Sequence, residues 1–301
     1  MRKKIIALIL VVFSFTFALL FNSCGYSKNS NNQSNLDYYS INYNDDYYFV
    51  KGNNVIVKDN DENEKTLFKE NESLLLIGIE NNTLYYETSN NKTNAFNIKK
   101  YELENKKKTV LIDSSKYKKF KNEYLHNVEL KNNKLFLQVS YAFFVFDIKN
   151  AKLDKYADDV RKFQVKDNNL YFIDGSFNFY KLNLKDKNKK LVLKADDETK
   201  YSNFLVINDN IYLYSSNSKK LYLKNKDKLT CVDTENIDSS SLINYNNELY
   251  FIAENTLFKL DKSNNKQKIT ECENYSTGLE IINDKIYYIN LNDKLVYQNL
   301  D

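Results

Sequence analysis

Carboxylates and a single imidazole are the side chains of this sequence that could carry acid–base chemistry. His126 is the only histidine, which excludes zinc sites built from several histidines and triads with a spare imidazole ligand. A glycosidase-type mechanism would instead rest on two carboxylates. The candidates for that role are Asp174, Asp196, Asp197 and Glu198. The adjacent pair Asp196-Asp197 equally suits a turn, so an enzyme acting on glycans or cell-wall components is the alternative function and not the leading one.

Other catalytic and cofactor motifs are missing from the sequence. It contains no phosphate-binding loop, dinucleotide fingerprint, G-x-S-x-G elbow or CxxC pair. Its paired Asn and Asp residues lack the spaced ligands and the glycine of a calcium loop. We therefore expect no metal site and no cofactor, and no catalytic residue is assigned.

A second group of residues could bind a ligand without reacting with it. The segment from Asp113 to Asn127 interleaves lysines with aromatic residues, and later connections carry further aromatic residues. Aromatic rings beside lysines on variable loops could grip a glycan, an anionic polymer or a protein. The candidate binding residues are Lys116, Tyr117, Phe120, Tyr124, His126, Tyr141, Phe177, Tyr201 and Tyr275. The alternative is that the rings cap the ends of the fold and that the lysines form a solvated surface.

The N-terminal residues carry an export signal. Three cationic residues, Arg2 to Lys4, precede an uncharged run over residues 5–21, which is shorter than the ~20 residues of a membrane span. The run ends in Leu-Phe-Asn-Ser followed by Cys24. This arrangement resembles a bacterial lipoprotein signal peptide covering residues 1–23, although Phe21 and Asn22 depart from its commonest residues. The resemblance implies a diacylglyceryl group on the Cys24 sulfur and cleavage before this residue.

A polar segment follows Cys24. Residues 25–36 are rich in Asn and Ser and show no apolar period, which is typical of a flexible tether. We therefore expect a lipidated cysteine and tether over residues 24–37, a folded domain over 38–301, and a location on the extracytoplasmic side of the cell membrane.

The folded domain is organised by a repeat. A pair of Asn or Asp residues, then any one residue and an alternating apolar run, recurs seven times at intervals of 35 to 51 residues. The pairs stand at 44–45, 81–82, 132–133, 167–168, 208–209, 246–247 and 283–284. Asn and Asp tolerate the positive φ of type I′ hairpin turns, so they can replace Gly in this role. Intervals of this size indicate a solenoid or a propeller.

Each repeat reads as four short strands, which we name A to D. The fifth unit shows the pattern best, with NFLVIN, NIYLYSS, KLYLKN and LTCVD around its turns. The period is two throughout, which predicts an all-β chain in which four-stranded sheets are arranged as the blades of a propeller. Seven blades are expected, and six with one divergent unit are the alternative, since the second interval is 51 residues.

The second and third strands of these units resemble those of YWTD-like propellers, with LYYE, LYFI and IYYI in place of that motif. They are also similar to propellers of unknown function in exported proteins of low-GC Gram-positive bacteria. The resemblance covers residues 38–301 and brings no catalytic set with it. The first unit begins with strand A and the seventh ends after strand C, so the last D strand is missing unless residues before Asp37 supply it.

The remaining observations concern partners. The chain has 44 basic and 40 acidic residues and a net charge of +4, which is not the basic character of a nucleic-acid-binding protein. Cys231 and Cys272 lie on outer strands of neighbouring units, too far apart for a disulfide, so we expect free thiols. The leading hypothesis is a membrane-anchored, monomeric propeller that binds or scaffolds an envelope or extracellular protein or polysaccharide. A component of a sporulation or envelope assembly complex is a further possibility.

Overall fold

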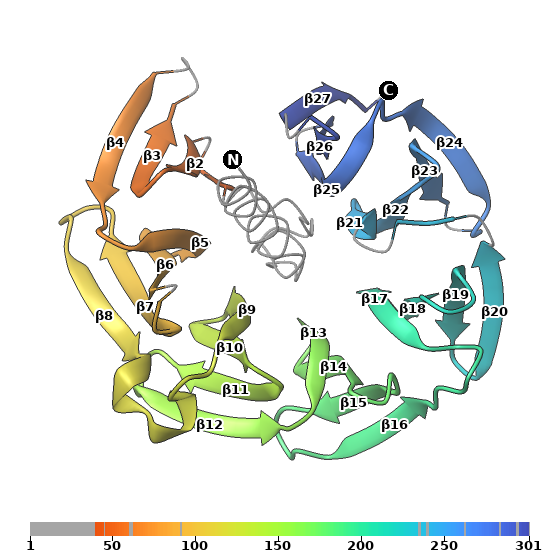
Figure 1. Ribbon diagram of the computed structural model, residues 1–301, viewed down its shortest axis with the longest axis horizontal. Coiled ribbons are helices and arrows are strands. Elements are labelled where there is room, and N and C mark those ends of the chain that lie inside the picture. The colour runs from red at the N-terminus through yellow and green to blue at the C-terminus, as the bar shows by residue number, and fades with distance from the viewer. Residues whose placement is uncertain are drawn as a thin grey trace, which may run out of the picture.

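The computed structural model describes residues 40–300 except 45, 60–62, 91, 234–235, 239–240, 262, 283 and 293–294. Seven antiparallel sheets are arranged around a central axis as the blades of a β-propeller (Figure 1). The N-terminal residues predicted to form a signal peptide, lipidated Cys24 and a tether lie outside the described part. In the part of the chain that is described, no helix is long and apolar enough to cross a membrane.

Four strands in sequence order form each of the first six blades. Blade 1 contains β1 (Ser40–Tyr43), β2 (Asp46–Lys51), β3 (Asn54–Lys58) and β4 (Glu64–Lys69). Blade 2 contains β5 (Ser73–Glu80), β6 (Thr83–Asn90), β7 (Ala95–Glu102) and β8 (Lys108–Asp113). Blade 3 contains β9 (Leu125–Lys131), β10 (Lys134–Val139), β11 (Ala142–Asp147) and β12 (Lys152–Ala157).

Blades 4 to 7 continue this order. Blade 4 contains β13 (Val160–Lys166), β14 (Asn169–Asp174), β15 (Phe179–Asn183) and β16 (Lys189–Leu193). Blade 5 contains β17 (Tyr201–Ile207), β18 (Asn210–Ser215), β19 (Lys220–Asn225) and β20 (Lys228–Asp233). Blade 6 contains β21 (Ile243–Tyr245), β22 (Glu248–Ala253), β23 (Thr256–Leu260) and β24 (Lys266–Glu271). Blade 7 contains β25 (Tyr275–Ile282), β26 (Lys285–Asn290) and β27 (Leu295–Asn299).

Seven blades are therefore confirmed, and the six-bladed alternative is wrong. The 51-residue interval belongs to a regular second blade whose first three strands have eight residues each. Its last strand is followed by two short 3-10 turns, η1 (Ser114–Lys116) and η2 (Lys118–Phe120). Among the described residues the seventh sheet has three strands, as the sequence predicts. Any contribution of the residues before Asp37 lies outside the described chain.

Four of the seven Asn/Asp pairs show the backbone conformation that a type I′ turn requires at both residues. Both residues have φ between 47° and 62° in the pairs at 81–82, 132–133, 167–168 and 246–247. Asn44, Asn208 and Asp284 show the same left-handed conformation in the remaining pairs. Each pair joins strands A and B of its blade, so seven two-residue hairpins without glycine define one face of the ring.

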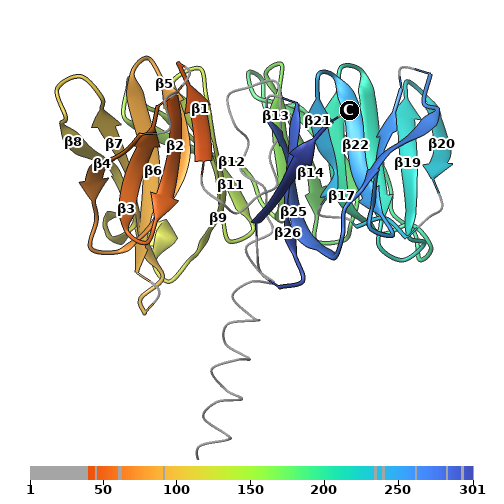
Figure 2. The same cartoon turned by 90° about the horizontal axis from the view of Figure 1, so that it is seen from above.

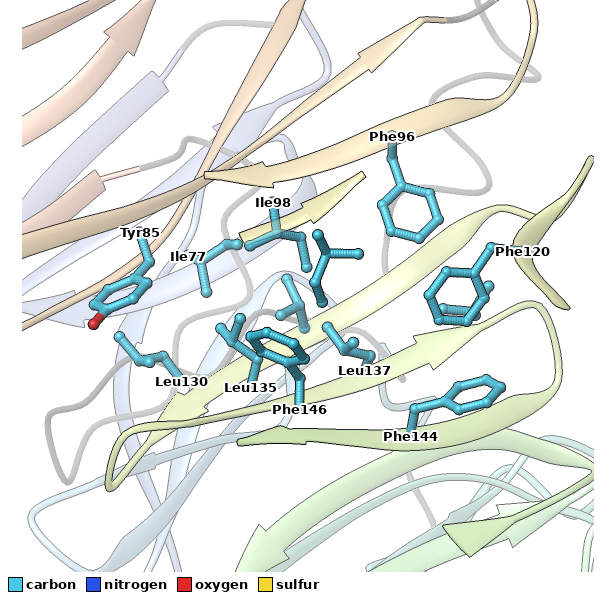
Figure 3. Close-up of a cluster of buried hydrophobic side chains, with 13 residues drawn as sticks. Ile77, Tyr85, Phe96, Ile98, Phe120, Leu130, Leu135, Leu137, Phe144 and Phe146 are labelled. Atoms are coloured by element: carbon cyan, nitrogen blue, oxygen red, sulfur yellow. The ribbon is translucent and has the colours of Figure 1, made fainter. Parts of the chain in front are cut away.

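The core is divided into clusters, and each cluster lies between two neighbouring blades. Along β6, Leu84 and Tyr86 pack toward blade 1, whereas Tyr85 packs toward blade 3. Alternate side chains of a middle strand thus enter two different clusters, which explains why these strands are apolar on both faces. Six such clusters join consecutive blades from the first to the seventh. Figure 3 shows the cluster between blades 2 and 3, where Phe96, Phe120 and Phe144 meet.

Side chains also tie four of the A–B turns to the preceding blade. The residue just before one turn reaches the turn of the next blade at four junctions. Tyr43 Oη donates to Asn82 Oδ1 (2.8 Å), and the Glu80 carboxylate accepts the backbone N–H groups of Asn132 and Asn133 (2.8 and 2.9 Å). Lys166 Nζ donates to the Asn208 carbonyl (2.8 Å), and Tyr245 Oη donates to Asp284 Oδ1 (2.7 Å). We call these contacts the turn straps.

Removing one strap should cost measurable stability. Tyr245 Oη also accepts the Asp284 backbone N–H (3.1 Å), so Tyr245→Phe leaves a carboxylate and an amide without this partner. We expect the free energy of unfolding to fall by about 1–3 kcal/mol in denaturant titrations. Tyr171→Phe is the matched control, because that half-buried tyrosine contacts Lys181 and Phe179 through its ring and makes no hydroxyl hydrogen bond among the described residues. Equal losses in the two variants would contradict a stabilising role for the strap.

Both thiols outside the N-terminal segment are free, as predicted. Cys231 is exposed on β20, and Cys272 is buried after β24. Burial raises the pKa of the Cys272 thiol to about 12, so this group stays protonated and packs as a small apolar side chain.

Candidate binding face

The two faces of the ring differ in the connections that they carry. The A–B and C–D turns lie on one face, which we call the turn face, and the B–C turns and D–A connections lie on the opposite loop face. Figure 2 shows the ring from the side, with the strands running between the two faces. The D–A connections range from the two residues between β12 and β13 to the eleven between β8 and β9. Variable loops on a rigid scaffold are the usual place for binding residues.

The longest connection is closed by an aromatic side chain. Phe120 is 2% exposed, and its ring lies 5.6 Å from that of Phe96 and 5.1 Å from that of Phe144, between centroids. Tyr117 is half-buried against the same cluster, with its ring centroid 5.4 Å from that of Phe120. This part of the loop is thus packed onto blades 2 and 3.

Polar contacts fix the start of the same connection. The Asp113 side chain accepts the backbone N–H and the hydroxyl of Ser115 (3.1 and 2.6 Å). The hydroxyl contact is the main cause of a lowered pKa of the Asp113 carboxyl. Lys116 lies 3.3 Å from this carboxylate but is otherwise exposed to solvent. At this end of the segment, Lys116 is therefore accessible to a partner.

An exposed aromatic group follows on blade 3. Tyr124 and Tyr141 are 54% and 61% exposed, and His126 lies between them with ring centroids 6.1 and 6.2 Å away. The Ser140 backbone N–H donates to the Tyr124 carbonyl (2.7 Å), which holds the two tyrosine segments together. Burial lowers the pKa of His126, with Glu123 acting in the opposite direction, so the imidazole is neutral at physiological pH.

The exposed surface continues onto blade 4 through backbone contacts. The Val160 backbone N–H donates to the Tyr141 carbonyl (2.7 Å), and Gln138 Nε2 donates to the carbonyls of Val160 and Arg161 (2.9 and 3.1 Å). Arg161 is skipped in the pairing of β13 with β14. This β-bulge directs an arginine toward the B–C turn of its own blade.

Arg161 meets an aromatic residue at that turn. Its guanidinium carbon lies 4.6 Å from the Phe177 ring centroid, and Lys200 Nζ lies 5.9 Å from the same centroid. Phe177 has a φ of 65° and donates its backbone N–H to the Asp174 carbonyl (3.0 Å). We name the set Tyr124, His126, Tyr141, Arg161, Phe177 and Lys200 the aromatic–basic arc, which crosses blades 3 and 4 toward blade 5.

A glycine and a buried carboxylate shape the B–C turn of blade 4. A Cβ atom on Gly175 would lie 2.3 Å from Asp159 Oδ1, so a larger residue would require this exposed side chain to move. The buried Asp174 carboxylate accepts the backbone N–H groups of Ser176 and Asn178 (2.9 and 2.8 Å). These constraints set the position of Phe177 beside Arg161.

The structure thus separates the predicted binding residues into two groups. Tyr124, His126, Tyr141 and Phe177 come together in the arc. Phe120, Tyr201 and Tyr275 are buried, so their expected place on an exposed binding face is corrected. Their rings enter the clusters between blades because each lies where a connection meets the next sheet.

Sequence reasoning missed the two cations of the arc. Arg161 is one of only two arginines in a chain with 44 basic residues, and the other is Arg2 in the signal segment. That rarity was a usable signal. Lys200 carries no comparable signal among so many lysines.

Two of the four carboxylates proposed for acid–base chemistry, Asp174 and Asp196, have structural partners, whereas Asp197 and Glu198 are exposed. Asp196 accepts the backbone N–H groups of Glu198 and Thr199 and the Thr199 hydroxyl (3.0, 2.7 and 2.7 Å). The hydroxyl contact is the main cause of its lowered pKa. Asp174 holds the turn described above. Both residues therefore serve the loop face as turn-forming acceptors, and the part of the chain that is described holds no cluster of three metal-ligating side chains.

Solved structures share this architecture. PorZ, an essential bacterial surface component of the type-IX secretion system of Porphyromonas gingivalis, superposes with a TM-score of 0.60 and 11% identity, covering 92% of this chain and 37% of that one. The extracellular domain assigned to a one-component system of B. thetaiotaomicron gives 0.58 and 10%, covering 88% and 38%. The computationally designed Ika8 protein gives 0.59 and 9%, covering 93% and 84%.

These identities are low, so the likeness shows the fold alone. The chain spans less than two fifths of the PorZ and B. thetaiotaomicron chains. No protein-family profile matches the sequence, and no curated protein matches it.

Proposed function

We propose that this protein is a surface lipoprotein whose propeller binds a polysaccharide of the envelope or surroundings through the aromatic–basic arc. The observation that carries the proposal is the pair of exposed rings, Tyr124 and Tyr141, on either side of a neutral His126. Two solvent-exposed tyrosines held by backbone contacts form a rigid apolar platform, and such platforms suit the flat faces of sugar rings.

The cations of the arc favour an acidic polymer. Arg161 presents its donors next to Phe177, and a guanidinium is suited to bidentate contacts with carboxylate or phosphate groups. A chain of sugars that lies across blades 3 and 4 would contact the tyrosines first and the arginine next.

The proposed anchor explains why such a module would stay at the surface. Each methylene of an acyl chain on Cys24 would contribute about 0.8 kcal/mol to membrane binding, so a diacylglyceryl group would hold the protein permanently. The similar structures described as a surface component and as extracellular domains are consistent with an exported propeller.

The test is a binding measurement with two tyrosines removed. Full-length protein in lipid nanodiscs is titrated against polygalacturonate by biolayer interferometry. Tyr124→Ala with Tyr141→Ala is expected to weaken binding at least tenfold, since stacking contacts of this kind contribute ~0.5–1.5 kcal/mol each beyond burial. Both side chains are exposed, so thermal unfolding should stay within a few degrees of the unchanged protein.

A matched control removes exposed apolar area elsewhere. Val110 and Leu229 are 52% and 38% exposed on the outer strands β8 and β20. Val110→Ala with Leu229→Ala should leave polygalacturonate binding unchanged. Equal binding by the tyrosine variant and the control would place the polysaccharide site elsewhere. Binding of a protein but of no acidic polysaccharide would overturn the choice of partner.

A further inference from the structure

A cavity of about 520 Å³ opens on the turn face between blades 3 and 4, opposite the arc. Its lining residues come from strands and turns of both blades. They are Lys131, Asn132, Lys134, Phe136, Val145, Tyr156, Val165, Asp167, Asn168, Leu184 and Lys185. The volume lies within the range typical of small-molecule sites.

The cavity coincides with a change in the turn straps. At four other junctions the residue before an A–B turn contacts the turn of the next blade. The corresponding residue here is Lys131, and no hydrogen bond joins it to the fully described turn at Asp167 and Asn168. The turn of blade 3 itself, at Asn132 and Asn133, is held by the Glu80 carboxylate of blade 2. The space that a strap would cross is therefore left open.

The cavity combines an apolar floor with a basic rim. Phe136, Val145 and Val165 are buried and belong to the cluster between blades 3 and 4, against which Tyr156 and Leu184 also pack. Lys131, Lys134 and Lys185 surround this floor, and Asp167 is the only carboxylate in the lining. Within the described chain no ion pair closer than 4 Å engages these three ammonium groups.

A further ammonium group lies beside the floor. Lys187 Nζ is 4.4 Å from the centroid of the Tyr156 ring, and Lys187 has a φ of 59° in the C–D turn of blade 4. The three lysines of the lining outnumber its one carboxylate, so the lining carries a net positive charge. These cations would attract an anion placed in the cavity.

We propose that this cavity binds an acidic sugar of single-ring size. The ring would lie on Phe136, Tyr156 and Leu184, its hydroxyl groups would contact Asn132, Asn168 and Asp167, and its carboxylate or phosphate group would meet Lys131, Lys134 and Lys185. The site is on the opposite face from the arc, so it stands or falls independently of the proposed polysaccharide site.

Calorimetric titration of the full-length protein in nanodiscs tests this site. Galacturonate and glucose 6-phosphate are the acidic probes, and glucose is the neutral control. At least one acidic probe is expected to bind with a dissociation constant below about 1 mM. Glucose should bind at least tenfold more weakly. The better acidic probe identifies whether the lysines prefer a carboxylate or a phosphate.

Variants locate the binding. Replacing the three rim lysines together by glutamine (Lys131→Gln, Lys134→Gln, Lys185→Gln) should weaken the acidic probe at least tenfold. Lys118→Gln, an exposed lysine on the loop face, is the matched control and should change nothing. Tyr124→Ala with Tyr141→Ala should also leave this binding intact, which separates the cavity from the arc.

Three results would overturn the proposal. The first is no heat of binding for either acidic probe at about 10 mM. The second is equal affinity for glucose and the acids. The third is unchanged affinity in the glutamine variant, measured on protein whose thermal unfolding matches that of the unsubstituted chain.

Discussion

Phe120→Ala is expected to lower the free energy of unfolding by about 3–5 kcal/mol, the usual cost of truncating a fully buried phenylalanine. The Phe120 ring fills the space between Phe96 of β7 and Phe144 of β11. Lys119 Nζ lies 4.8 Å from the centroid of the Phe144 ring. Alanine would leave a cavity between two blades that cannot close, because both sheets are fixed by their own hydrogen bonds. Urea titration followed by near-UV circular dichroism measures the loss.

The same loop supplies the control for this result. Tyr124 lies four residues further along the connection and is 54% exposed, so Tyr124→Ala should change the free energy of unfolding by less than about 0.5 kcal/mol. A loss below about 1 kcal/mol for Phe120→Ala would show that the connection is not packed onto the blades. The pair of variants thus separates the residue that holds the loop from the residue that it presents.

The architecture could be predicted because its signals are local. A type I′ turn involves two residues, and the left-handed φ values at Asn81 and Asn82 follow from the tolerance of asparagine for that conformation. Alternation of period two is read over six residues. Seven copies of both signals determine the number of blades, and the seventh sheet has three strands among the described residues.

The binding face could be predicted only in part, because burial depends on distant residues. Phe120 and Tyr124 are aromatic residues four positions apart in one lysine-rich segment, and nothing local distinguishes them. Phe120 is buried because Phe144, on another blade, lies against it. The turn straps escape prediction for the same reason, since Tyr43 and Asn82 are 39 residues apart. Contacts between blades must be known before the exposed residues can be named.

Glu129 is a buried carboxyl group whose role can be inferred from the equivalent residue of the next blade. It lies on the innermost strand β9, is 3% exposed, and accepts the Val165 backbone N–H through Oε2 (3.3 Å). Gln164 occupies the equivalent place one blade later, three residues before its A–B turn. Its side chain accepts the Val206 N–H (2.7 Å) and donates to the Val206 carbonyl (3.2 Å).

The comparison with Gln164 indicates that the Glu129 carboxyl is protonated in the folded protein. Burial raises the pKa of Glu129 to about 8, against smaller opposing effects of Val165 and Lys131. A protonated carboxyl offers one donor and one acceptor, as an amide does. A raised pKa on the inner strand could indicate a catalytic acid, but the contact with the neighbouring blade identifies a bridge between blades 3 and 4.

Glu129→Gln should therefore remove a pH dependence of stability. In the unsubstituted protein the folded state holds the Glu129 proton up to about pH 8, whereas the unfolded chain releases it near its ordinary pKa of about 4.5, so stability falls as pH rises between these values. The fall is on the order of 5 kcal/mol. Glutamine keeps the donor and acceptor without a proton to lose. In urea titrations the free energy of unfolding of the variant should therefore match that of the parent at pH 5 and exceed it at pH 9.

Glu198→Gln is the control, because this side chain is exposed, and it should keep the parental dependence of stability on pH. If Glu129→Gln also keeps this dependence, Glu129 is ionised in the folded protein and the bridge is made by a carboxylate.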